Sequence, residues 1–160
     1  MVLAKGDSAI DFVAYDTDNN KVQLFDNLTK TTVLAFFPAA FTGVCESELC
    51  HFQNDLAKLS DLNSQVIAVS VDGPFSLKAF KDKNNLDFPV LSDYNREIVT
   101  KYGITLENFI GMTGYTAAKR SVFVIDQNKL IQYVWISDDP GVEPNSVSYT
   151  HLTLPTILLV

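Results

Sequence analysis

The two cysteines of the chain, Cys45 and Cys50, are five residues apart and follow an apolar run that is typical of a buried strand. That run, Thr31 to Phe37, ends at Pro38, and the residues after it predict a helix with Cys45 in its first turn. The thiolate is the reactive form of cysteine, and a helix N-terminus or a nearby cation can lower a thiol pKa from about 8.5 to between about 3.5 and 7.5. Cys45 is therefore predicted to be a reactive thiol.

Residues around Cys45 have opposite effects on the ionisation of its thiol. Thr42 is the expected N-cap, and its hydroxyl is placed to bond either the free N–H groups of the first turn or the sulfur. The carboxylates of Glu46 and Glu48 oppose a thiolate, so a cation from elsewhere in the chain is required. Arg120, at the start of a predicted strand, is the candidate cation, and the alternative is that it is a solvated residue at a strand end.

The spacing of the two cysteines limits how they can pair. Residues five apart on an unbroken helix have Cα atoms about 8.5 Å apart, whereas a disulfide usually needs less than about 7 Å. A bond between Cys45 and Cys50 therefore requires the first turns of the helix to unwind, and it would belong to a reaction cycle. The alternative is that Cys50 is only a small buried hydrophobic residue.

Metal and cofactor sites are not favoured by the sequence. The C-x4-C spacing with only His51 nearby falls short of four well-spaced ligands, and the 7 dispersed glycines match no phosphate-binding or dinucleotide-binding fingerprint. We therefore expect no metal and no cofactor.

Composition points to one soluble domain. The chain has 160 residues, of which 47% are hydrophobic, and no apolar run long enough to span a membrane. A net charge of -7 with scattered Lys and Arg argues against a nucleic-acid partner. The first residues lack the pattern of a secretory signal, so we expect a cytoplasmic location, where two cysteines are more often reactive than structurally paired.

The order of predicted elements indicates an α/β fold in which helices flank a central mixed sheet, with a small hairpin near the N-terminus. The expected strands are 12–15, 22–24, 31–37, 66–71, 88–91, 121–125 and 130–135, and the expected helices are 43–59, 74–83 and 95–102.

The last residues differ from the rest of the chain. Ser146 to Val160 contains no Lys, Arg, Asp or Glu, and VSYTHLTLPT at 147–156 looks like a translated sequencing adapter. We therefore predict one domain over residues 1–145 and a non-native tail at 146–160, in place of a native C-terminal segment.

The segment Pro38 to Cys45 (PAAFTGVC) resembles the P-x-x-x-T-x-x-C active-site motif of the peroxiredoxins. Three further segments resemble family segments in the same order: Gly6–Phe12, Phe88–Asp93 and Arg120–Asp126. The resemblance implies a thioredoxin-like fold and a thiol peroxidase that reduces hydrogen peroxide and organic hydroperoxides. It also implies a thioredoxin-like dithiol protein as the reductant, and a monomer or a homodimer.

Matching positions in that family imply roles for particular residues. Cys45 would be the peroxidatic cysteine, Thr42 and Arg120 would hold the peroxide oxygens and the thiolate, and Pro38 would shield the pocket from water. Glu48 matches a position that helps to order the site.

The role of Cys50 separates two classes of the family. Cys50 is similar to the resolving cysteine of the bacterioferritin comigratory protein or peroxiredoxin Q class. The same segment also resembles the AhpE-like class, whose members commonly lack a cysteine at this position. Outside the family, the alternatives are a thiol–disulfide oxidoreductase or redox sensor without peroxide turnover, and a binding module with incidental cysteines. The absence of a C-x-x-C motif argues against the oxidoreductase.

Aromatic residues are candidates for an apolar mouth that suits alkyl hydroperoxides, and the alternative for at least one of them is core packing. These candidates are Phe41, Phe109 and Trp135.

Overall fold

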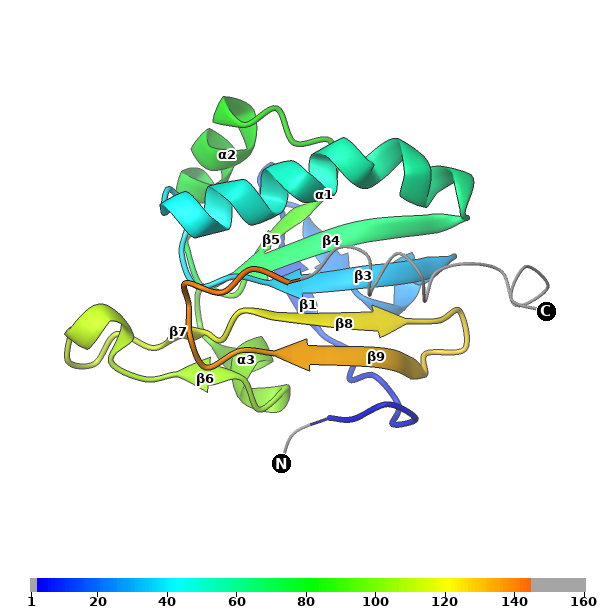
Figure 1. The fold of residues 1–160 in the computed structure, drawn as a ribbon. Coiled ribbons are helices and arrows are strands. Elements are labelled where there is room, and N and C mark those ends of the chain that lie inside the picture. The colour runs from blue at the N-terminus through cyan, green and yellow to red at the C-terminus, as the bar shows by residue number, and fades with distance from the viewer. Residues whose placement is uncertain (1–2, 145–160) are drawn as a thin grey trace.

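The computed structural model describes residues 3–144, which form a mixed seven-stranded sheet with helices on both faces (Figure 1). The order across the sheet is β2-β1-β5-β4-β3-β8-β9. Neighbours among β3, β4 and β5 are parallel, and the remaining pairs are antiparallel. The strands are β1 (Val13–Tyr15), β2 (Lys21–Gln23), β3 (Thr31–Phe36), β4 (Ser64–Ser70), β5 (Val90–Ser92), β8 (Ser121–Ile125) and β9 (Ile131–Ile136). The predicted α/β class, mixed sheet and N-terminal hairpin are confirmed.

Each face of the sheet has its own hydrophobic core. The helices α1 (Gly43–Asp61) and α2 (Pro74–Lys83) cover one face, and the short helix α3 (Glu97–Lys101) lies on the other (Figure 1). Side chains of a strand alternate between faces, so Val33 and Ala35 of β3 pack toward α1 while Leu34 and Phe36 pack toward α3. Burial on both faces explains why the central strands are apolar throughout.

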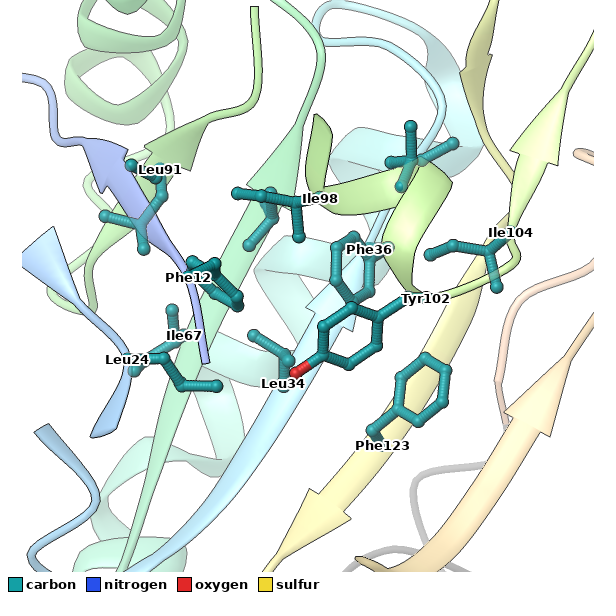
Figure 2. Packing of buried hydrophobic residues seen from close by; sticks show 14 of the residues in the cluster. Phe12, Leu24, Leu34, Phe36, Ile67, Leu91, Ile98, Tyr102, Ile104 and Phe123 are labelled. Atoms are coloured by element: carbon teal, nitrogen blue, oxygen red, sulfur yellow. The ribbon is translucent and has the colours of Figure 1, made fainter. Parts of the chain in front are cut away.

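Aromatic rings fill the core on the α3 side. Tyr102, just after α3, lies between Phe36 and Phe123, with ring centroids 5.5 Å and 5.3 Å away (Figure 2). Its hydroxyl donates a hydrogen bond of 2.6 Å to the Ile10 carbonyl, so this buried polar group is satisfied. Phe36 is the last residue of β3, and this packing holds the strand end that leads into α1.

Two distant parts of the chain meet at the end of the sheet where the C-terminus of β3 lies. α1 begins seven residues after Phe36, and β8 runs antiparallel to β3 with Ser121 opposite Phe36. Arg120 is the residue before β8. It therefore lies at the same end of the sheet as the C-terminus of β3, although it is 75 residues after Cys45 in the chain. This register explains how one cation reaches the first turn of α1.

Most predicted elements are confirmed with small shifts at their ends. The predicted strand 88–91 is Val90–Ser92, and the predicted helix 95–102 is shortened to Glu97–Lys101. Four pieces of two or three residues were not predicted, since such short segments carry no periodicity: η1 (Phe25–Asn27), β6 (Thr105–Leu106), η2 (Phe109–Gly111) and β7 (Ala117–Ala118).

The proposed non-native tail at 146–160 lies outside the described residues. Within residues 3–144, no helix is both long and apolar enough to cross a membrane. The cytoplasmic location stays a prediction.

Candidate active site

The loop between β3 and α1 is fixed by a carboxylate from the neighbouring strand. Asp72, shortly after β4, accepts hydrogen bonds from the Ala40 backbone N–H at 2.8 Å and from the Ser70 hydroxyl at 2.7 Å. The next residue, Phe41, adopts a left-handed backbone with φ of 64°, which is uncommon outside glycine. These contacts set the path by which the chain enters α1.

Thr42 begins α1 but does not cap it with its side chain. Its backbone is extended, with φ of −97° and ψ of 145°, and its carbonyl accepts from the Glu46 N–H at 2.9 Å. Its hydroxyl donates to the Ala39 carbonyl at 2.9 Å. The predicted N-cap position is therefore confirmed. The predicted hydroxyl bond to the first turn or to the sulfur is wrong, because the hydroxyl donates its hydrogen bond to the Ala39 carbonyl instead.

Cys45 and Arg120 form the centre of the site. Cys45 is the third residue of α1 and is 1% exposed, and its Sγ accepts a hydrogen bond of 2.9 Å from Arg120 Nη2. Arg120 is also 1% exposed, so the alternative of a solvated strand end is wrong. A guanidinium and a helix N-terminus both stabilise negative charge on the sulfur.

The guanidinium of Arg120 is held on three sides. Besides Cys45, its Nη1 donates to Glu48 Oε2 at 2.5 Å, and its Nε and Nη2 donate to the Pro140 carbonyl at 3.1 Å and 2.8 Å. The planar fork of an arginine allows these bonds at once, which the single ammonium group of a lysine does not.

Glu48 is a buried acid on the same face of α1 as Cys45, three residues further on. It is 1% exposed, and burial raises its pKa from 4.5 to about 7, although the Arg120 charge opposes the rise. Its Oε1 atom has no hydrogen-bond partner among the described residues. Glu46 points elsewhere, because its carboxylate pairs with Lys83 at 2.9 Å, and that bond lowers the pKa of Glu46.

A pocket of about 220 Å³ opens over Cys45. Phe109 lines this pocket as predicted, but Phe41 and Trp135 do not, since Phe41 packs on Phe80 and Trp135 on the core under α1. Ile110 contributes the other apolar wall and is 70% exposed, with a left-handed φ of 54°. The lining residues are Pro38, Thr42, Gly43, Val44, Cys45, Phe109, Ile110, Arg120, Pro140 and Gly141.

Cys50 does not reach Cys45 in this conformation. Both thiols are free, and α1 is continuous from Gly43 to Asp61, so the predicted obstacle to a disulfide is present. Cys50 is half-buried against the end of α2, with its Sγ 3.6 Å from Asn84 Oδ1. Among residues 3–144, no group of three or more His, Cys, Asp or Glu side chains is placed to hold a metal ion.

The 137–143 segment, which follows β9, contacts the first turns of α1. It leaves β9 and returns toward the start of the helix (Figure 1). Glu143 accepts a hydrogen bond of 3.2 Å from the Ser47 hydroxyl and is paired with His51 Nδ1. Sequence reasoning missed this segment, as it missed Ile110, since nothing in the local sequence reports contacts between distant loops.

Comparison with known proteins agrees with this geometry. Residues 5–134 match the AhpC/TSA family. A Mycobacterium tuberculosis protein with a provisional peroxiredoxin name is 34% identical over 126 residues, which cover 79% of this chain and 80% of that protein. The chloroplastic peroxiredoxin Q of Oryza sativa subsp. japonica is 30% identical over 133 residues, or 83% of this chain and 59% of that protein. The crystal structure of the peroxidoxin BcpB from Mycobacterium tuberculosis has a TM-score of 0.84 at 24% identity, covering 94% of this chain and 96% of that one.

A thioredoxin-like mixed sheet with a buried cysteine beside an arginine at a helix N-terminus defines the peroxiredoxin class of oxidoreductases. The chain belongs to the AhpC/TSA family of peroxiredoxins and is a peroxidase. The predicted fold and the predicted family are both confirmed. A monomer or a homodimer stays a prediction.

Proposed function

We propose that Cys45 reduces hydrogen peroxide and organic hydroperoxides by attacking one peroxide oxygen as a thiolate. The observation that carries this proposal is the bond of 2.9 Å from Arg120 Nη2 to Cys45 Sγ, at a pocket through which a peroxide can enter. The guanidinium places a positive charge within hydrogen-bond distance of the attacking sulfur. The apolar side chains of Phe109 and Ile110 suit the alkyl group of an organic hydroperoxide.

Attack forms an S–O bond, breaks the O–O bond and develops negative charge on the departing oxygen. Arg120 and the backbone N–H groups of Val44 and Cys45, in the first turn of α1, are the donors proposed to meet that charge. Thr42 donates its hydroxyl hydrogen bond to the Ala39 carbonyl, so its oxygen can accept a hydrogen bond from the peroxide. Pro38 lines the pocket and is proposed to shield the reacting atoms from water.

The sulfenic acid at Cys45 is proposed to condense with the Cys50 thiol, forming a disulfide and releasing water. Because the two Cα atoms are about 8.5 Å apart on an intact helix, α1 must first unwind at its N-terminal end. A thioredoxin-like dithiol protein is the proposed reductant, since exchange with an external dithiol returns both cysteines to the thiol form.

The proposal is tested by the intact mass of the reduced protein after one equivalent of hydrogen peroxide, measured without reductant. A loss of two hydrogen atoms reports the Cys45–Cys50 disulfide, and a gain of one oxygen atom on Cys45 reports a sulfenic acid that is not resolved. An unchanged mass, with peroxide left in solution, contradicts the proposed activity. Peroxide consumption with a thioredoxin system then tests the reductant.

The Cys50→Ser variant separates the two halves of the cycle. It is expected to react once with peroxide, because Cys45, Arg120 and the pocket are untouched, and then to stop as a sulfenic acid. Its mass should rise by one oxygen atom, and its turnover with a thioredoxin system should be lost. Full turnover of Cys50→Ser with a thioredoxin system would contradict the resolving role of Cys50.

The Glu143→Gln variant tests whether the 137–143 segment restrains α1. It removes the charge that pairs with His51, a contact between partly exposed groups that is worth about 0.2–1 kcal/mol. Disulfide formation after one equivalent of peroxide should therefore become faster, by up to about fivefold, with less sulfinic acid in excess peroxide.

Asp138→Asn is the matched control for this variant, because Asp138 lies in the same segment but pairs with Lys119 at 2.7 Å instead of with α1. Equal rates of disulfide formation in Glu143→Gln and the control would show that Glu143 does not restrain the helix. Stopped-flow mixing followed by acid quench and mass measurement gives both rates.

A further inference from the structure

Cys45, Glu48 and Arg120 form a buried cluster with two potential anions and one cation. Each of the three residues is 1% exposed, and Arg120 donates to both Cys45 Sγ and Glu48 Oε2. A thiolate and a carboxylate together would place two negative charges around a single guanidinium. A buried negative charge without its own partner is costly, so the cluster favours one anion at a time.

Among residues 3–144, Arg120 is the one cation that acts on the Glu48 carboxyl. The groups facing it are Arg120 from just before β8, Cys45 from its own helix and the carboxylate of Glu143, whose negative charge also opposes ionisation of Glu48. Glu143 is itself paired with His51 on the outer side of α1. The Oε1 atom of Glu48, which has no partner among the described residues, receives no hydrogen bond to stabilise a negative charge.

We propose that Glu48 holds one proton while Cys45 is a thiolate and gives that proton up when the sulfur loses its charge. Glu48 is then a positioning residue that keeps the cluster at one negative charge before and after the reaction. The raised pKa of Glu48, at about 7, agrees with a carboxyl group that changes its protonation near neutral pH.

The exchange of protons in this proposal balances, and its peroxide step rests on the proposed function. A thiolate, a protonated Glu48 and a hydroperoxide give a neutral sulfenic acid, a Glu48 carboxylate and an alcohol or water. Glu48 does not line the pocket, so the departing oxygen takes its proton from water and Glu48 returns one to water. Arg120 then keeps a full ion pair with Glu48, and the neutral sulfur is free to leave it when α1 unwinds.

The test is an infrared difference spectrum of full-length Cys50→Ser protein at a pH of about 6.5, where Cys45 is the single cysteine. The sulfur is neutralised in two separate arms, by one equivalent of hydrogen peroxide and by iodoacetamide. In both arms the C=O band of a protonated carboxylic acid should disappear as a carboxylate band grows. Labelling the protein with ¹³C-glutamate should shift the lost band, which assigns it to a glutamate.

Two variants in the same background assign the band to one residue. Glu48→Gln should show no loss of the band, and it should take up about one proton per oxidised Cys45 from weakly buffered solution, where the parent takes up little. Glu46→Gln is the matched control, because Glu46 is on the same helix turn but pairs with Lys83, and it should retain the band and its loss.

The alkylation arm separates failure of this inference from failure of the proposed function. If iodoacetamide modifies Cys45, as the mass shows, and the carboxylic acid band stays, Glu48 does not carry the proton and the inference is overturned. If alkylation removes the band but peroxide leaves Cys45 unchanged, the shared proton stands and the peroxidase proposal fails. The parent spectra alone decide this point, whether or not Glu48→Gln folds.

Discussion

The Cys45→Ser variant is expected to consume no peroxide above the uncatalysed background, in single-turnover or steady-state measurements. A serine hydroxyl is not ionised near neutral pH, and Arg120 cannot make it a comparable nucleophile. Removal of a catalytic nucleophile costs about six orders of magnitude in kcat in a well-studied hydrolase, so the residual rate should be undetectable. An intact mass unchanged by one equivalent of peroxide is the direct readout.

The fold should survive this change, because serine is close to cysteine in size and can accept the same hydrogen bond from Arg120. A cooperative melting curve checks this. The matched control is Cys50→Ser, which makes the same substitution five residues away and is expected to keep one turnover. Peroxide consumption by Cys45→Ser at the rate of the parent protein would remove Cys45 as the nucleophile.

Local sequence was sufficient for the parts of the site that are contiguous in the chain. The apolar run of β3, the break at Pro38 and the apolar residues at steps of three and four predict the strand, the loop and α1. The buried positions Leu49, Phe52 and Leu59 confirm which face of the helix packs on the sheet. Arg120 was found by a charge requirement, since Cys45 needed a cation that its neighbours in sequence do not supply.

Contacts between loops could not be predicted in the same way. Three groups reach the site from loops: the Pro140 carbonyl, Glu143 and Ile110. The positions of these loops depend on packing along the whole end of the sheet. Glu48 is an intermediate case. Its spacing of three from Cys45 places both on one helix face, which was a signal for a buried acid. The register of β8 against β3 then brings Arg120 to the same face.

Replacement of Arg120 by methionine is expected to lower the rate of peroxide reduction and the stability of the protein together. The side chain fills similar space but supplies no charge and no donor. Loss of one preorganised donor to a developing anion costs about 2.7–4 kcal/mol, or about 10²–10³-fold in rate. Loss of the positive charge beside the sulfur adds to this, because Arg120 is the hydrogen-bond donor to Cys45 Sγ. Stopped-flow measurement of peroxide reduction gives the total.

The effect of this variant on stability should depend on pH. Removal of one partner of a buried ion pair costs about 3–5 kcal/mol when the other stays charged. Glu48, however, can avoid the charge by holding a proton, since its pKa in the folded protein already exceeds the ordinary value of 4.5. A group whose pKa is raised in the folded protein contributes to stability fully at pH values below its unfolded pKa, here about 4.5. That contribution is lost as the pH rises toward the folded pKa. Both proteins should lose stability as the pH rises above about 4.5, but the extra loss in Arg120→Met, where Glu48 has no cation to favour its charged form, should appear as the pH rises above about 7.

A double variant separates the two effects of Arg120. Arg120→Met with Glu48→Gln removes both charges, so most of the lost stability should return at neutral pH, while the rate of peroxide reduction should stay low. Arg120→Lys should retain a charge but not the three simultaneous contacts of the fork, and its rate should lie between those of the parent and Arg120→Met. Recovery of both stability and rate in the double variant would mean that Arg120 acts on the reaction only through the fold. Recovery of stability alone assigns it directly to the thiolate and the departing oxygen.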